Sequence, residues 1–134
     1  MKQISIFIEN EKGTLAKVTS LLAEKEINLK ALSIADTAEY GILRIIVDEP
    51  EKASEILSSA GYLSKINDVI AVDIDDRPGS LNRIISALYA EHISVEYTYA
   101  FPSAKKGKAF MAFRVNDNEK AIAALKSAGI NATL

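Results

Sequence analysis

Apolar and polar residues alternate along residues 3–9, and the isoleucines at positions 4, 6 and 8 fall on one face. A period of two is typical of a half-buried β-strand. Gly13 interrupts this pattern, and apolar residues then recur at helical spacing, at positions 15, 18, 21 and 22. We therefore expect a strand over residues 3–9 and a helix over residues 14–26, with Thr14 as a candidate helix cap.

A hairpin, a second helix and a last strand should follow. The expected elements are strands over residues 29–36, 42–47 and 62–66 and a helix that begins near Pro50 and ends near Gly61. Residues 37–41 are short enough to connect two of these strands as a hairpin. The order strand, helix, strand, strand, helix, strand predicts a split βαβ, or ferredoxin-like, unit.

The whole pattern returns farther along the chain. Adding 66 to a position takes Ile4 to Ile70, and adding 68 takes Leu43 to Met111. The second copy predicts strands over residues 69–75, 94–101, 109–115 and 130–134 and helices over residues 80–91 and 118–127. We expect an α+β fold of two ferredoxin-like βαββαβ units, residues 1–67 and 68–134, each with an antiparallel sheet and its helices on one face. The connection at residues 67–68 is too short for a flexible linker, so the units should be tightly joined.

The second strands of the two copies differ in one stripe of alternating residues. The first copy carries Leu29, Ala31, Ser33 and Ala35, whereas the second carries Val95, Tyr97, Tyr99 and Phe101. Aromatic stripes on strands usually pack, so these side chains could fill a core or a contact between the domains. The alternative is that they form the wall of a ligand pocket that differs between the two halves.

Composition excludes several classes of function. The 134-residue chain is 49% hydrophobic and 25% charged, which suits one globular core or two small ones. A net charge of −2 leaves no broad positive surface for nucleic acid or an anionic membrane. The absence of cysteine excludes disulfides and thiolate chemistry. No apolar run approaches the ~20 residues that span a bilayer, and the start lacks a signal peptide's apolar centre, so we expect a cytoplasmic protein.

Two short loops repeat the same chemistry before the first helix of each copy. The first loop is Asn10, Glu11, Lys12, Gly13, Thr14 and Leu15, and the second is Asp76, Arg77, Pro78, Gly79, Ser80 and Leu81. A helix N-terminus carries unpaired backbone NH groups and partial positive charge, so it receives a carboxylate favourably. An oxygen of Asn10 or Asp76 could accept hydrogens from an amino group, so each loop suits an amino acid. The alternative is that Thr14 and Ser80 are ordinary caps and the glycines only permit a turn.

The two copies resemble a tandem of ACT domains. The resemblance lies in an acidic or amide residue three positions before the glycine and in a later Ile-Asn-Leu (residues 27–29) or Ile-Ser-Val (residues 93–95). ACT domains are small regulatory modules of amino-acid metabolism, and they typically bind an amino acid where two of them meet. The resemblance places the ligand loops at residues 10–15 and 76–81, with a further ligand contact at Asn28, whose place in the second copy is taken by Ser94.

The two predicted sites are not equivalent. The amide pair Asn10 and Asn28 favours the first loop as the better amino-acid site, because Ser94 replaces the asparagine in the second copy. Asp76 could instead pair with Arg77 or receive a basic group of the ligand.

Other polar clusters are weaker candidates. The basic turn at residues 105–108 could contact a phosphate or an acidic partner, although a solvated hairpin fits it better. The aspartates at positions 73, 75 and 76 could attract a cation but offer no complete metal-binding loop, and His92 is the only histidine. Neither a phosphate loop nor a nucleophile paired with a base is visible, so we expect no catalytic residue, no metal and no cofactor.

The sequence as a whole predicts a small regulatory protein without a catalytic domain. We expect it to bind an amino acid or a related small metabolite at the interface of its ACT-like units and to signal to a partner protein, such as a metabolic enzyme. A homodimer is expected, whereas nucleic acid and membranes are not expected partners. The alternative hypothesis is a structural or assembly subunit of a metabolic enzyme complex that binds no ligand.

Overall fold

The computed structural model describes residues 1–36, 40–103 and 105–134. The chain forms two compact units, one of Lys2–Asn67 and one of Asp68–Leu134 together with Met1. Met1 joins the second unit because its ammonium group donates to the Val69 carbonyl at 3.0 Å and its carbonyl accepts from the Val69 amide at 2.9 Å. Within the described ranges, no helix has both the length and the apolar character needed to cross a membrane.

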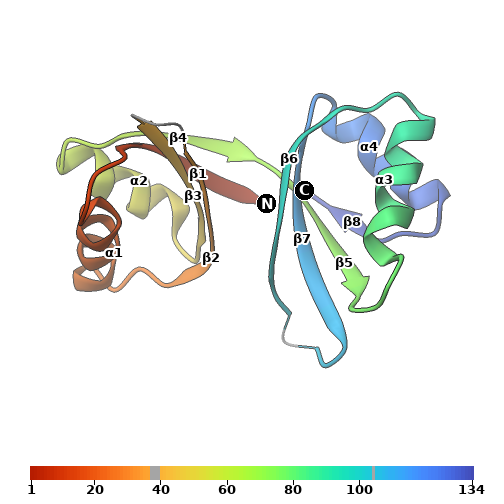
Figure 1. Cartoon of the computed structure of the whole chain (residues 1–134), viewed down its shortest axis with the longest axis horizontal. Coiled ribbons are helices and arrows are strands. Elements are labelled where there is room, and N and C mark those ends of the chain that lie inside the picture. Colours follow the sequence, from red (N-terminus) through yellow and green to blue (C-terminus); the bar gives the residue numbers. More distant parts are fainter. Residues whose placement is uncertain (37–39, 104) are drawn as a thin grey trace. The chain divides into compact units, whose positions relative to one another are not determined.

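The first unit contains β1 (Lys2–Glu9), α1 (Thr14–Glu24), β2 (Leu29–Asp36), β3 (Tyr40–Val47), α2 (Pro50–Ser59) and β4 (Leu63–Asp68). Its strands form one sheet in the order β2-β3-β1-β4, and both helices cover the same face (Figure 1). β2 and β3 pair antiparallel up to Asp36 and Gly41, as a hairpin requires. The predicted hairpin connection covers residues 37–41; β3 already begins at Tyr40, and residues 37–39 lie outside the described residues.

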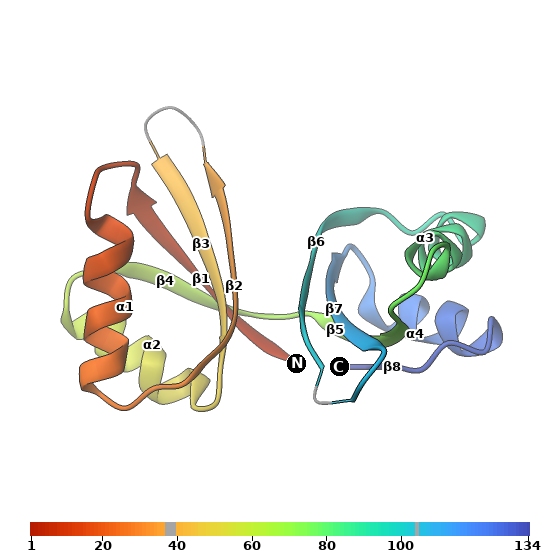
Figure 2. The ribbon, with the colours of Figure 1, turned by 60° about the horizontal axis from the view of Figure 1, so that its bottom comes forward.

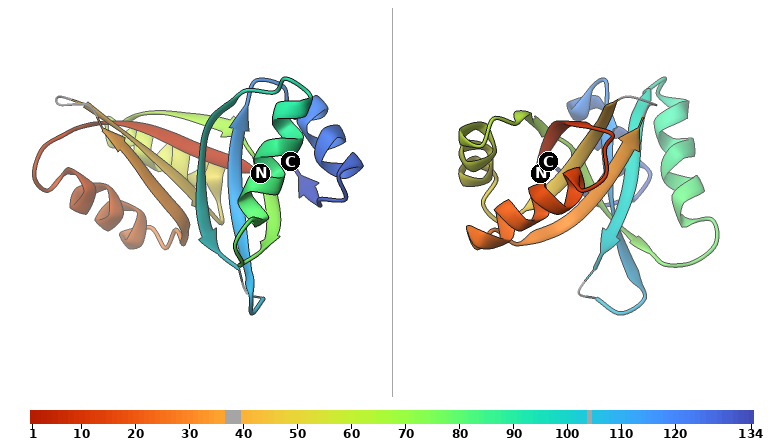
Figure 3. Two further views of the ribbon diagram at one scale, coloured as in Figure 1. Left: turned by 45° about the vertical axis from the view of Figure 1, so that its right-hand side comes forward. Right: turned by 60° about the vertical axis from the view of Figure 1, so that its left-hand side comes forward.

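The second unit repeats this arrangement with β5 (Ile70–Asp75), α3 (Ser80–Ala90), β6 (Val95–Pro102), β7 (Lys108–Val115), α4 (Asn118–Ser127) and β8 (Ala132–Thr133). Its sheet has the order β6-β7-β5-β8, and Figure 3 shows α3 and α4 on one side of it. The predicted α+β class with two βαββαβ units is therefore confirmed.

The last strand is shorter than the sequence predicts. Only Ala132 and Thr133 pair with β5, although the pattern predicts a strand over residues 130–134. The reason lies at the end of α4, where the Ile130 amide donates to the Leu125 carbonyl at 2.9 Å and the Ile130 side chain enters the core. Strand pairing can begin only after this turn, and residues 129–131 consequently stand apart from β5.

Matching positions of the two copies fill two separate cores. Ile4 pairs with Ile45 in the first sheet, and Ile70 pairs with Phe113 in the second. All four side chains are buried beneath the helices of their own unit. Burying a side chain of this size stabilises a fold by roughly 1.5–3 kcal/mol. The apolar side chains that alternate along the strands of each copy thus pack each sheet against its own pair of helices.

A bulge early in β2 and in β6 divides the stripe that the sequence assigns to one face. The pairing register shifts between Leu29 and Ala31 and again between Val95 and Tyr97. An extra residue moves the side chains that follow it to the other face of the strand. Leu29 and Val95 therefore pack against the helix-covered cores, whereas the residues that follow them in each stripe lie on the opposite face.

The aromatic stripe of β6 accordingly lies outside the core of its own unit. Tyr97, Tyr99 and Phe101 occupy the face without helices, and Phe101 stacks on Phe110 of β7 with ring centroids 5.3 Å apart. The helix-covered face of β6 carries small residues instead, as Ala100 stands opposite the buried Met111.

Candidate ligand-binding loops

The loops at residues 10–15 and 76–81 adopt the same backbone in both units. Gly13 and Gly79 are left-handed, with φ of 88° and 87°, and each directly precedes its helix. Thr14 and Ser80 are the first helical residues, and no described side chain caps α1 or α3, so the interpretation of these hydroxyls as caps is wrong. Among the described atoms, none lies within 4 Å of the place where a Cβ on either glycine would stand. Glycine is therefore needed for the backbone conformation, and the space beside it is open.

The other two helices begin differently. α4 starts at Asp117, whose carboxylate accepts the amide hydrogen of Lys120 at 3.0 Å. α2 has Pro50 at its start, which lacks a backbone donor. α2 therefore also lacks a side-chain cap within the described part of the chain, and α4 is capped. What α1 and α3 share is a left-handed glycine directly before an uncapped first turn.

Backbone hydrogen bonds leave the same two amides open in each loop. The Thr14 amide donates to the Glu11 carbonyl at 3.3 Å, and the Lys17 amide donates to Gly13 at 3.0 Å. The matching bonds of the second loop join Ser80 to Arg77 at 3.3 Å and Arg83 to Gly79 at 3.0 Å. The amides at positions 15, 16, 81 and 82 therefore lie at the positive ends of α1 and α3 without a partner in the helix ladder. A carboxylate is the group best suited to them.

The polar residues of the first loop lie at the surface. Asn10, Glu11 and Lys12 are exposed, and the Glu11 amide turns back to the Glu9 carbonyl at 2.9 Å. Leu15 is also exposed, whereas Thr14 is half-buried.

Asn28 and Ser94, the predicted ligand contacts before β2 and β6, do not lie near the glycine loop of their own unit. Asn28 and Ser94 follow the far ends of α1 and α3, and an 11-residue helix is about 16 Å long (Figure 2). Their amides donate at 3.1 Å to the side-chain oxygens of Asp48 and Asn116, which follow β3 and β7. Asn10 and Asn28 of one unit therefore stand at opposite ends of α1 and not side by side.

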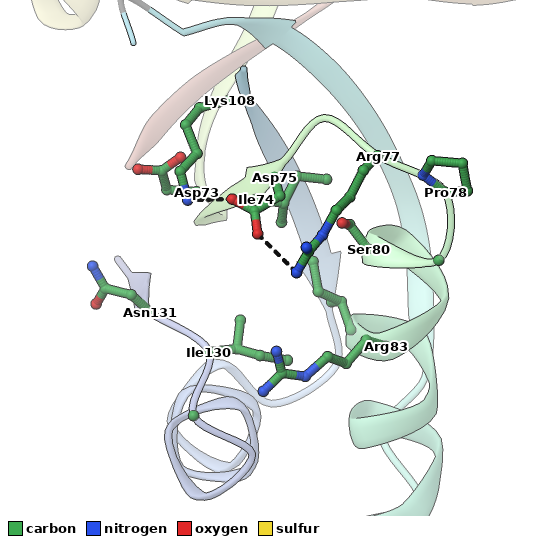
Figure 4. Close-up of a pocket in the computed structure, with 13 residues that line it drawn as sticks. Asp73, Ile74, Asp75, Arg77, Pro78, Ser80, Arg83, Lys108, Ile130 and Asn131 are labelled. Atoms are coloured by element: carbon green, nitrogen blue, oxygen red, sulfur yellow. Dashed lines mark ion pairs between the residues drawn. The ribbon is translucent and has the colours of Figure 1, made fainter. Parts of the chain in front are cut away.

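The second loop borders a cavity of about 640 Å³. Arg77, Pro78, Gly79 and Ser80 line the cavity, whereas Asp76 and Leu81 of the same loop do not. The facing wall consists of residues 129–131, which stand apart from β5 because β8 begins only at Ala132. In Figure 4 the side chains of Arg77 and Arg83 extend from the α3 side toward the space between these walls.

Asp75 is the centre of an ion cluster that lines this cavity. Its carboxylate pairs with Lys108 Nζ at 2.6 Å and with an Arg77 guanidinium nitrogen at 3.2 Å. The hydrogen bond from Lys108, helped by the charges of Lys108, Arg77 and Arg83, lowers the pKa of Asp75. The same bond raises the pKa of Lys108. Asp75 is therefore ionised at neutral pH, and three cations surround this one carboxylate.

Sequence reasoning assigned Arg77, Pro78, Gly79 and Ser80 of this cavity to a site and treated its aspartates and Lys108 as weaker candidates. The basic turn and the aspartates pair with one another, since Lys105 lies 3.4 Å from Asp73. The described residues contain no group of His, Asp and Glu side chains that could hold a metal ion. Arg83 is absent from the predicted site, although a signal existed: its counterpart 66 residues earlier is Lys17, and that of Arg77 is Glu11. The second copy is thus the more cationic one at these positions.

Comparison with known proteins identifies relatives of both units. A family model described as an ACT domain pair matches residues 1–132. The acetolactate synthase small subunit of Aquifex aeolicus is 32% identical over 76 residues, which cover 56% of this chain and 40% of that protein. The corresponding subunit of Haemophilus influenzae is 28% identical over 69 residues, covering 52% of this chain and 42% of that protein. The matched part spans less than half the length of these curated relatives.

Solved structures extend the likeness to the whole chain. A protein from Bacteroides thetaiotaomicron superposes with a TM-score of 0.90 at 39% identity, over 98% of this chain and 90% of that one. The ligand-free regulatory subunit of aspartate kinase from Thermus thermophilus gives a TM-score of 0.69 at 19% identity, over 95% of this chain and 91% of that one. At this lower identity, the likeness is one of fold.

Proposed function

The chain belongs to the ACT domain pair family, and we propose that it is a cytosolic regulatory protein that binds an amino acid at its glycine loops. The observation that carries this proposal is the pair of helix starts at Gly13 and Gly79. They share one left-handed glycine backbone before a helix without a side-chain cap among the described residues; α2 is uncapped too but begins with a proline, and α4 is capped by Asp117. Because this open helix N-terminus occurs at the same place in both units, a ligand-binding role explains it better than the alternative that the glycines only permit a turn.

The two ends of an amino acid would meet different groups of each loop. The α-carboxylate would accept hydrogen bonds from the open amides, at positions 15 and 16 or 81 and 82, and would gain from the helix dipole. The ammonium group would meet a side-chain oxygen of Asn10 or Asp76, both of which are exposed beside the helix start. A zwitterion can bind both the open amides and the side-chain oxygen of such a loop, whereas a simple anion can bind only the amides.

The proposed signal passes to another protein. The chain is similar in sequence to the small subunit of acetolactate synthase and in fold to the regulatory subunit of aspartate kinase. We therefore propose a metabolic enzyme as the partner. A homodimer is proposed because Leu81, Ile85 and Tyr89 form an exposed apolar stripe along α3. Ligand would act by favouring one arrangement of the subunits over another.

Thermal unfolding with each of the twenty amino acids at millimolar concentration tests this proposal. A ligand at about 100 times its dissociation constant stabilises the folded state by about 2.7 kcal/mol, which moves the midpoint by several degrees. Gly13→Val and Gly79→Val, made singly and together, should reduce or abolish that ligand-induced shift, because a β-branched side chain distorts the left-handed loop.

Gly61→Val is the matched control. Gly61 also has a positive φ, of 85°, but it follows α2 and belongs to neither loop. Its replacement should lower the midpoint of the free protein while the shift with ligand persists. If no amino acid moves the midpoint of the unmodified protein, the role of an assembly subunit without a ligand becomes the better explanation.

A further inference from the structure

The cavity beside the α3 loop carries more positive charge than its own carboxylates neutralise. Lys108 and Arg77 both pair with Asp75, while Asp73 pairs with Lys105. Arg83 also lines the cavity, and among the described residues it forms no ion pair; its hydrogen bond goes to the Ala128 carbonyl, at 2.6 Å. Asp75 thus has three cations around it, and one of them has no carboxylate of its own.

The rest of the lining suits the carbon skeleton of a small metabolite. Ile74, Ile84 and Ile130 contribute apolar surface, and a volume of about 640 Å³ falls in the range of small-molecule sites. The start of α3 opens on the same space, since Gly79 and Ser80 line it. Asp73 adds a carboxylate to the lining, and one of its oxygens is buried without a hydrogen-bond partner in the described structure.

The first unit carries the opposite charge at the matching positions. Asp75 pairs across the sheet with Lys108, and the equivalent pair in the first unit is Glu9 with Tyr40. Shifting Arg77 and Arg83 by 66 residues gives Glu11 and Lys17. The four positions hold three cations and one carboxylate in the second unit, but one cation and two carboxylates in the first. An additional anionic group would therefore be attracted to the second unit and repelled by the first.

We propose that the site in the second unit selects an acidic amino acid, whose side-chain carboxylate binds the guanidinium groups of Arg83 and Arg77. The α-carboxylate then lies at the start of α3, beside Gly79 and Ser80. In this cavity the ammonium group faces Asp73 in place of Asp76, because Asp73 lines the cavity and Asp76 does not. Arginine is suited to this role because its planar fork binds a carboxylate through two hydrogen bonds. The inference rests on the proposed function, since it names the ligand of one of the two loops.

Isothermal titration of the full chain tests the inference with pairs of ligands that differ only in charge. Glutamate and aspartate are compared with glutamine and asparagine, and succinate and inorganic phosphate serve as anions without an amino group. An acidic amino acid should bind at least about tenfold more tightly than its amide, the smaller end of what a charged hydrogen bond contributes. Phosphate and succinate should bind more weakly than glutamate or aspartate.

Three variants locate the selectivity. Arg83→Gln should remove the preference for the acid while binding of the amide persists, and Arg83→Lys should restore part of it. Arg77→Glu places in the second unit the residue type that the first unit has at position 11, and it should also abolish the preference. Arg114→Gln is the matched control, because Arg114 likewise donates to a backbone carbonyl, that of Asp68 at 3.2 Å, but does not line the cavity; it should leave the preference unchanged.

The possible failures are distinguishable. If glutamine and asparagine bind as tightly as their acids, the selectivity is wrong and amino-acid binding stands. The same conclusion follows if Arg83→Gln leaves the preference intact. If succinate or phosphate binds as tightly as glutamate, the cavity is only an anion site, and the proposed amino-acid function fails at this loop as well. If no amino acid binds in titration or shifts the melting midpoint, both proposals are overturned.

Discussion

Replacing Gly13 by alanine should lower the free energy of unfolding by about 1–2 kcal/mol, the cost of a left-handed backbone for a residue that has a Cβ. The structure limits the cost to the backbone, because no described heavy atom lies within 4 Å of the added carbon. The φ of 88° lies well beyond the left-handed minimum near 57°, so we expect the upper half of that range. Gly61, in the same unit, has a φ of 85° and equally open surroundings, so Gly61→Ala should cost the same.

Urea denaturation followed by circular dichroism measures both variants under identical conditions, and the slope with denaturant shows whether the unfolded states are comparable. The two losses should agree to within about 0.5 kcal/mol, since the sites are independent and the perturbation is the same. A loss above about 3 kcal/mol at Gly13 alone would mean that the glycine is held by close packing. No loss at Gly13 would refute the argument that this loop needs a left-handed residue.

Other perturbations test the remaining elements. Asp117→Ala should cost about 1 kcal/mol by removing the 3.0 Å cap of α4, and Asp117→Asn should recover most of it; equal losses in urea for both would contradict a capping role. Leu57→Ala should cost about 2–5 kcal/mol, because this side chain of α2 is fully buried in the first core, and a loss below about 1 kcal/mol in the same assay would contradict close packing there. Asp75→Asn should reduce stability at neutral pH but not in acid. The pKa of Asp75 is lowered in the folded protein by Lys108, so its stabilising effect is present above the unfolded-state pKa and is lost as the pH falls through the folded one. Melting midpoints of the two proteins should converge as the solution is acidified, and a gap that widens in acid would refute the ion pair.

The fold was accessible from the sequence because its signals are local and appear twice. Alternating isoleucines at positions 4, 6 and 8, helical spacing after Gly13 and the repeat of both in the second copy are enough to predict two βαββαβ units. The glycine loops were accessible for the same reason. The cap was misassigned because hydroxyl residues are common caps, and only the backbone angles show that Gly13 and Gly79 stand one residue earlier at the helix start.

The face on which the β6 side chains lie could not be predicted from the local sequence pattern. Val95 and Tyr97 have the spacing of one face, yet a bulge between them sends them to opposite faces. A bulge depends on how a strand pairs with its neighbour, and a period of two contains no information about it. Asn10 and Asn28, which the sequence assigns to one site, lie at opposite ends of α1, and the sequence pattern does not show this separation.

The sequence by itself determined the repeated βαββαβ order, the position of the two glycine loops and the membership of the chain in a family of paired ACT domains. Only the tertiary structure decided that Arg77, Arg83 and Lys108 would surround Asp75 at a cavity. These residues come from a loop, a helix and two strands, and their meeting depends on the register of β5 with β7 and on the late start of β8. Long-range register and the point at which a strand begins are set by the balance of packing over the whole unit, so no short stretch of sequence encodes them.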